Sequence, residues 1–170
     1  LEMVQHLHND ALVVSLQVRE CQVKRILIDQ GSSCDIMYVR CYKELGLHPD
    51  DMEQSNGPMV GFNGTPTWPL GTVALEVQAG TRKIKTEFTI IDTPSPYNII
   101  LGRPWLYGMG AVLSTLHQLL RFPTEHGIEE IRGDQLQAKN YSMAVMKSTC
   151  SIRELERVEI EDEDVEVLED

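Results

Sequence analysis

The chain has 170 residues, enough for one domain of ordinary size, and 42% of them are hydrophobic, which is sufficient to build a core. Its formal net charge of −11 argues against a nucleic-acid ligand, because affinity for a phosphate backbone comes largely from Lys and Arg releasing counterions. No apolar run approaches the ~20 residues that cross a bilayer, and no basic segment precedes an apolar stretch near the start. We therefore expect no membrane, no direct nucleic-acid partner, and an intracellular, cytoplasmic location.

The first third of the chain predicts a hairpin followed by a helix. Residues 12–18 alternate between apolar and other side chains, as in a strand with one buried face. A second apolar run covers residues 23–28, and the break at 19–22 is short enough for a hairpin turn. A short helix is predicted over residues 35–45, and Gly46 is expected to end it.

The remainder predicts mostly strands. Residues 73–77 and 84–90 alternate in the same way and form a second hairpin around Gly80. A buried strand is expected over 97–101 and a short helix over 104–108. An apolar run over 111–122 ends at Pro123, and a last strand is expected over 128–131. Many short strands, few helices and regularly spaced turns are typical of an all-β barrel or sandwich.

Neither the cysteines nor the histidines have the spacing of a metal site. Zinc sites and disulfide scaffolds usually show paired cysteines, and none of the four cysteines forms a CxxC pair. The histidines show no arrangement such as His-Glu-x-x-His. We expect a reducing compartment, no metal and no cofactor.

The candidate catalytic residue is Asp29, which directly follows the apolar residues 26–28 and precedes Gly31 by two positions. The strand would fix the carboxylate at its exit, and Gly31 would permit a tight turn close to a ligand. The hydroxyl of Ser32 can hydrogen-bond the carboxylate and bias its ionisation. Asp-x-Gly by itself favours the alternative of a turn aspartate that caps a loop, because the motif is common in turns.

Three motifs that follow one another along the chain make the interpretation of Asp29 as a catalytic residue more specific. They are Leu27-Ile28-Asp29-Gln30-Gly31-Ser32, Val60-Gly61-Phe62-Asn63-Gly64 and Ile100-Leu101-Gly102-Arg103. Together they resemble a retropepsin, the aspartic protease of retroviruses and long-terminal-repeat retrotransposons. The chain is especially similar to protease segments of plant gypsy-type elements, through Leu101-Gly102-Arg103-Pro104, Phe122-Pro123-Thr124-Glu125-His126-Gly127 and Arg132-Gly133-Asp134-Gln135. The resemblance covers roughly residues 8–145.

The resemblance implies a retropepsin-like closed β-barrel with a flap hairpin and one or two short helices, completed as a two-fold homodimer. Asp29 is then the catalytic aspartate, in a loop formed with Gln30, Gly31, Ser32 and Ser33. The flap, which covers a bound substrate, includes Val60, Gly61, Phe62, Asn63 and Gly64. Structural support comes from Leu101, Gly102 and Arg103, with Asp35 as a candidate ion-pair partner of Arg103.

Two positions depart from the family pattern. The residue after the catalytic aspartate is usually Thr or Ser, whose hydroxyl bonds across the dimer, and here it is Gln30. An acidic residue often stands four places after the aspartate, and here that place is Ser33. Gln30 keeps open an alternative function, in which the chain is a catalytically inactive dimerisation or peptide-binding domain from a decayed or domesticated element.

The number of motifs determines the expected assembly. Hydrolysis by this route needs two carboxylates that share one proton, and the sequence has one Asp-x-Gly-Ser, so a second copy would supply the other carboxylate. The expected function is an aspartic endopeptidase that cuts a polypeptide substrate, the polyprotein of a retrotransposon, with reverse transcriptase downstream in the parent chain. The expected organisation is an N-terminal linker over 1–8, the protease domain over 9–145 and an acidic, disordered linker over 146–170.

Overall fold

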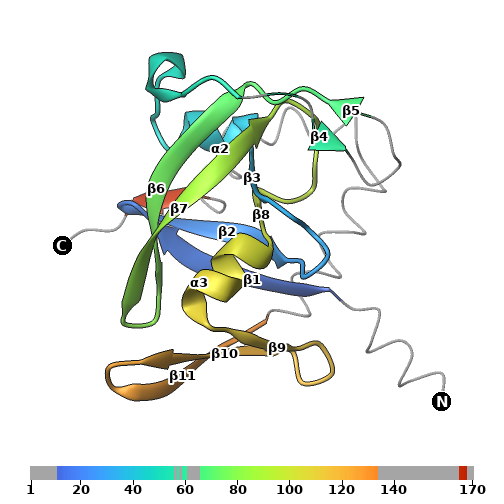
Figure 1. Ribbon diagram of the computed structural model, residues 1–170. Helices are drawn as coiled ribbons and strands as arrows, with labels where there is room; N and C mark the ends of the chain where they lie inside the picture. Colours follow the sequence, from blue (N-terminus) through green and yellow to red (C-terminus); the bar gives the residue numbers. More distant parts are fainter. Residues whose placement is uncertain (1–10, 56, 58, 61–65, 134–164, 168–170) are drawn as a thin grey trace, which may run out of the picture.

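The computed structural model describes residues 11–55, 57, 59–60, 66–133 and 165–167, and most of them belong to strands (Figure 1). The elements are β1 (Leu12–Val18), β2 (Cys21–Ile28), β3 (Asp35–Tyr38), α2 (Val39–Glu44), the 3-10 turn η1 (Pro49–Asp51), β4 (Met59–Val60), β5 (Pro66–Thr67), β6 (Gly71–Ala79), β7 (Arg82–Ile91), β8 (Ile99–Leu101), α3 (Arg103–Met109), β9 (Val112–Ser114), β10 (Leu119–Thr124), β11 (Gly127–Arg132) and β12 (Val165–Val167). None of the described helices is long and apolar enough to cross a membrane.

The main sheet closes on itself as a barrel. Its strands follow the order β1, β6, β7, β3, β8, β2, and β2 pairs again with β1 along the hairpin that the sequence predicts. Alternate side chains of β1 and β6 point into the barrel, where they form one apolar core with Trp105 and Met109 of α3. The predicted all-β barrel is therefore confirmed.

Two pairs of parallel strands determine where the loops of this barrel meet. β2 runs parallel to β8, with Ile28 opposite Leu101, and β3 runs parallel to β7. Since neighbouring parallel strands end at the same edge of a sheet, the residues that follow β2 and those that follow β8 emerge side by side. Asp29 and Gly102 are the first residues after these two ends.

A three-stranded sheet of β9, β10 and β11 packs beneath the barrel (Figure 1). The guanidinium of Arg82 joins the two parts, because it donates to the carbonyl oxygens of Gly108, Met109 and Pro123 at 2.8–3.1 Å. Glu129 adds a second link, since its carboxylate accepts hydrogen bonds from Thr81. These bonds lower the pKa of Glu129 below its ordinary value.

One sequence prediction about an element is corrected. Residues 35–45 were expected to form one helix, but the first four form β3 and α2 begins only at Val39. β3 lies between β7 and β8 and pairs with both, so tertiary pairing overrides the local helical pattern. The apolar run over 111–122 contains two strands, β9 and β10, separated by a turn in which Gln118 has a φ of +53°.

The acidic C-terminal segment was predicted to be a disordered linker over 146–170. Residues 165–167 instead form β12, which pairs antiparallel with the start of β2. The rest of that segment, like the predicted N-terminal linker, lies outside the described residues, and there both predictions stay predictions.

Candidate active site

Asp29 lies at the exit of β2, where the parallel partner β8 fixes its backbone. Its amide donates to the carbonyl oxygen of Leu101 at 2.9 Å, which extends the β2–β8 pairing by one more bond. Its side chain is half-buried. The barrel therefore holds the carboxylate at a fixed point of the strand edge and leaves it partly accessible.

The loop that follows turns back onto this carboxylate. The amide of Gly31 donates to Oδ1 of Asp29 at 2.9 Å, and the amide of Ser32 donates to the main-chain carbonyl of Asp29 at 3.2 Å. A Cβ atom at Gly31 would lie 3.2 Å from that same Oδ1, which is tighter than an ordinary contact. Glycine is favoured here because it lets the backbone amide approach the carboxylate.

Ser32 has a different partner from the one expected. Its hydroxyl donates to the carbonyl of Cys34 at 2.6 Å and does not reach the carboxylate of Asp29. Its own carbonyl accepts from the amide of Arg103 at 2.9 Å. The buried serine therefore shapes the loop and attaches it to α3, and the expected bond from Ser32 to the catalytic carboxylate is corrected.

Gly102 makes the attachment between loop and helix possible. A Cβ atom there would lie 2.5 Å from the carbonyl oxygen of Cys34 and 2.6 Å from that of Ser32. Both are backbone atoms, which cannot move aside as the end of a flexible side chain could. The close approach thus excludes any side chain at Gly102, while the buried Leu101 before it belongs to the barrel core.

Asp35 is the second carboxylate of this region, and its surroundings are unlike those of Asp29. It is only 4% exposed, and its Oδ1 accepts from the amide of Gly102 at 2.7 Å. A second bond comes from the amide of Trp105, so the carboxylate satisfies two donors at the start of α3. Burial raises the pKa of Asp35 to about 6, against the lowering effect of these two bonds.

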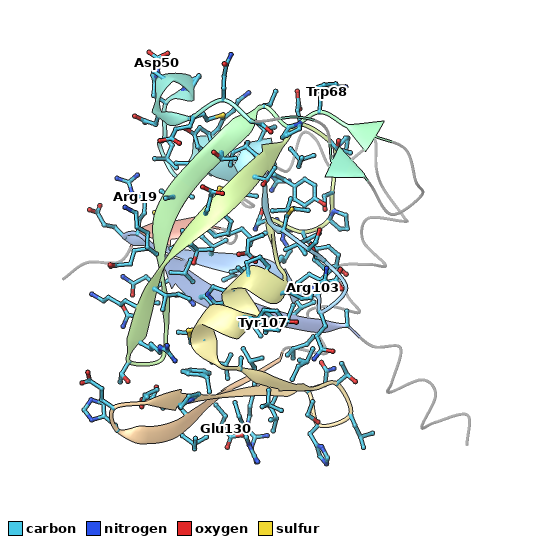
Figure 2. All side chains as sticks on the ribbon, in the orientation of Figure 1. Arg19, Asp50, Trp68, Arg103, Tyr107 and Glu130 are labelled. Atoms are coloured by element: carbon cyan, nitrogen blue, oxygen red, sulfur yellow. The ribbon has the colours of Figure 1, made fainter. Side chains whose placement is uncertain are left out.

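The proposed ion pair between Asp35 and Arg103 is not formed. Arg103 is exposed, and among the described residues no ion pair joins it to Asp35 (Figure 2). The physical reason is that Asp35 faces backbone amides inside the fold, whereas the side chain of Arg103 begins the helix on the outside.

Gln30 and Ser33 are the two exposed side chains of the loop. The side chain of Gln30 makes no hydrogen bond to any other described residue, and the hydroxyl of Ser33 lies 3.9 Å from the sulfur of Cys34. Both side chains are therefore accessible to solvent at this end of the barrel.

Only β4 and β5, at the two ends of the predicted flap region, belong to the described residues. β4 and β5 pair antiparallel, with Met59 opposite Thr67 and Val60 opposite Pro66. Val60 thus lies in an arm of the hairpin, while Gly61, Phe62, Asn63 and Gly64 lie outside the described residues.

Comparisons with known proteins bear on this arrangement. No protein-family model and no curated protein matches the chain. Among solved structures, the retroviral protease-like domain of Ddi1 from Leishmania major matches with a TM-score of 0.55 and 17% identity, over 73% of this chain and 93% of that one. The chain has the retropepsin-like fold.

Two further retropepsin structures are similar at lower scores. A retropepsin-like aspartic protease from Rickettsia conorii matches with a TM-score of 0.47 and 13% identity, over 71% of this chain and 81% of that one. The EIAV protease, in complex with the inhibitor HBY-793, gives 0.45 and 23% identity, over 59% of this chain and 92% of that one. The fold assignment rests on the Ddi1 domain.

Sequence reasoning missed a second apolar cluster, which lies next to the strand that ends at Asp29. Ile36, Ile91 and Ile100 form a second hydrophobic cluster, separate from the core, against which partly buried side chains pack, namely Leu27, Cys34 and Tyr38. Leu27 lies two residues before Asp29 and pairs with Ile100. The signal was the apolar run Ile26–Ile28 at the end of β2, since consecutive apolar residues indicate that both faces of a strand are covered.

The site offers one available carboxylate per chain. Asp35, the nearest other acid along the loop, is buried and already bonded to two amides, so it is unsuited to activate water together with Asp29. No group of three His, Cys, Asp or Glu side chains in the described part of the chain is arranged to hold a metal ion. The chemistry that these residues support is proton transfer by a carboxylate.

Proposed function

We propose that the chain is the protomer of an aspartic endopeptidase, which acts as a two-fold homodimer with Asp29 from each copy. The observation that carries the proposal is the position of Asp29, held at the exit of β2 by the carbonyl of Leu101 and oriented by the amide of Gly31. A half-buried carboxylate in a glycine loop, on a retropepsin-like barrel, is suited to work with its symmetry-related copy.

In this mechanism the two Asp29 carboxylates share one proton. Like charges about 3 Å apart cannot both ionise, so the pair holds one proton over a range of mildly acidic pH. The ionised carboxylate takes a proton from water as the water attacks the peptide carbonyl, and the protonated one donates to the carbonyl oxygen. The bond from Gly31 keeps Oδ1 in place, which leaves the other oxygen free for this transfer.

The substrate is proposed to be a polypeptide with apolar side chains around the scissile bond. Leu27, Cys34 and Tyr38 pack, partly buried, against the buried cluster of Ile36, Ile91 and Ile100, next to the strand that ends at Asp29. An apolar substrate side chain that covers their exposed part would remove both surfaces from water. The sequence motifs shared with plant gypsy-type elements favour a retrotransposon polyprotein as the natural substrate, with reverse transcriptase in the same parent chain.

The hairpin of β4 and β5 is proposed as the flap. Its arms are paired as a flap requires, and the glycines at positions 61 and 64 would permit the tip to open and close over substrate. Closure would exclude water from the two carboxylates and strengthen their hydrogen bonds to the peptide.

Replacing Asp29 by Asn tests the proposal directly. The amide oxygen of Asn can still accept from Gly31, so the fold should survive, while the hydrolysis of a peptide with apolar residues at the cleavage site should fall by at least about 10²-fold. Asp50→Asn is the matched control, because it makes the same chemical change at a remote, exposed position (Figure 2). Peptide cleavage that survives in Asp29→Asn, or that pepstatin-like peptides fail to inhibit, would refute the assignment.

A further inference from the structure

The edge of β2 that faces away from β1 is occupied along its whole length by three different segments. β8 pairs with Ile26–Ile28. Asn98 covers the middle of the edge: its side-chain amide donates to the carbonyl oxygen of Lys24 at 2.7 Å, and its backbone amide donates to the carbonyl oxygen of Arg25 at 3.0 Å. β12 pairs with Cys21–Val23. Of these three segments, β12 comes from the part of the chain farthest from β2.

Without β12, the start of this edge would be open. The pairing with β8 begins only at Ile26, and Asn98 donates only to Lys24 and Arg25, so the backbone groups of Cys21–Val23 on this side would have no described protein partner. An unpaired edge of this kind is a ready template for another extended segment.

The segment that occupies it has a distinct composition. Val165-Glu166-Val167 alternates β-branched and acidic residues, and the preceding four residues of the sequence are all acidic. Antiparallel pairing places Val165 opposite Val23, Glu166 opposite Gln22 and Val167 opposite Cys21. β-branched residues in alternation favour an extended strand.

The receiving edge has a cation beyond each end and one acid beside the first of them. Arg19, in the turn before β2, is exposed (Figure 2), the exposed Glu20 lies between it and the paired residues, and Lys24 follows the paired residues directly. The position of Glu166 is opposite Gln22, with Lys24 two residues along β2 on one side and Glu20 on the other. An acidic strand therefore meets an edge where two cations outnumber one acid.

We propose that the edge of β2 formed by Cys21–Val23 is a peptide-docking site for extended, acidic, valine-containing segments, and that residues 165–167 of the same chain occupy it as a detachable strap. Three paired residues give few hydrogen bonds, each of modest net strength, so docking is reversible. Attachment to the same chain compensates, because it keeps the segment at a high effective concentration near the site. The same β2 strand ends at Asp29, so the strap and the candidate active site share one element.

The test uses the full chain with Val165→Pro and Glu166→Pro together. Adjacent residues in a strand point their amides in opposite directions, so one of the two prolines removes a ladder bond whatever the register. Hydrogen exchange at the amides of Cys21–Val23 that face the strap should become at least tenfold faster, while exchange at Ile26–Ile28 stays unchanged. Val158→Pro with Glu159→Pro is the matched control, since it alters the same dipeptide earlier in the tail.

A synthetic peptide of residues 161–170, added to the double-proline variant, should restore the protection, more weakly at high salt, and a scrambled peptide of equal charge should not. Faster exchange in the control but not in the test variant, or equal rescue by the scrambled peptide, would overturn the proposal. Protection in the native chain that rises with protein concentration would show the tail of a second copy on the edge and would overturn the assignment of the strap to its own chain.

Discussion

Asp29 and Asp35 stand at the two ends of the same loop, and the fold places their carboxylates in opposite surroundings. Asp29 is half-buried and takes one amide, from Gly31, whereas Asp35 is buried and takes the amides of Gly102 and Trp105. One carboxylate is left available for chemistry, and the other is used to attach the loop to α3. Residue type alone therefore does not distinguish the candidate catalytic acid from a structural one, whereas the number of bonds already made and the access to solvent do.

The pH dependence of stability should separate the two acids most clearly. Asp35 has a folded-state pKa raised from its ordinary value of 3.8 to about 6, so the native state holds its proton more tightly than the unfolded state does. The free energy of unfolding should then fall as the pH rises from about 4 to about 6, by up to about 3 kcal/mol from this group. Asp35→Asn should lose that part of the pH dependence in urea unfolding.

The pH dependence expected from Asp35 has a matched control. Asp50→Asn changes an exposed acid in the same way and should keep the wild-type pH profile. If Asp35→Asn unfolds with the same dependence on pH as the wild type, the carboxyl of Asp35 is not the buried, shifted group that its surroundings indicate.

Replacing Gly102 by Ala tests whether the attachment of the loop to α3 matters for the chemistry of Asp29. A Cβ atom in Gly102→Ala would meet two backbone carbonyls of the loop, so the loop must shift, at a cost of about 1–3 kcal/mol in the free energy of unfolding. Peptide hydrolysis should fall as well, since the loop positions Gly31 against Asp29. Thermal unfolding and turnover would be measured together.

Gly108→Ala is the matched control for that variant. The added Cβ atom would lie 3.3 Å from one flexible side-chain atom, Cδ1 of Ile84, and alanine favours a helix. Stability and turnover should both stay close to the wild type. Equal effects of the two substitutions would mean that the loop tolerates displacement from α3.

The smallest expected effect concerns Gln30, which is exposed in the protomer beside Asp29. In a dimer its long amide would be buried where the family has a short hydroxyl, and an unpaired amide there costs about 1–3 kcal/mol, equivalent to tenfold or more in dimer affinity. Gln30→Thr should therefore tighten the dimer in sedimentation equilibrium, and Gln54→Thr, at another exposed position, should not. A weaker dimer would show that Gln30 makes an adapted contact of its own.

The local patterns of the sequence predicted the hairpin of β1 and β2, the hairpin of β6 and β7, and the position of Asp29 at a strand exit. These features are local, because period-two alternation records which face of a strand is buried and Asp-x-Gly marks a turn within a few residues. Gly102, in contrast, was assigned through a family motif, and its contact with the loop depends on the parallel pairing of β2 with β8.

Only the tertiary structure decided the features that depend on contacts between distant segments. Residues 35–38 form a strand because β7 and β8 lie on both sides of them, against the helical pattern that their sequence suggested. Asp35 accepts hydrogen bonds from two backbone amides, and not from the predicted partner Arg103, because the loop folds over the start of α3. For the same reason the hydroxyl of Ser32 bonds to Cys34 and not to Asp29. β12 formed in a segment whose charge predicted disorder, since an open edge of β2 supplies the hydrogen bonds that the segment cannot make alone.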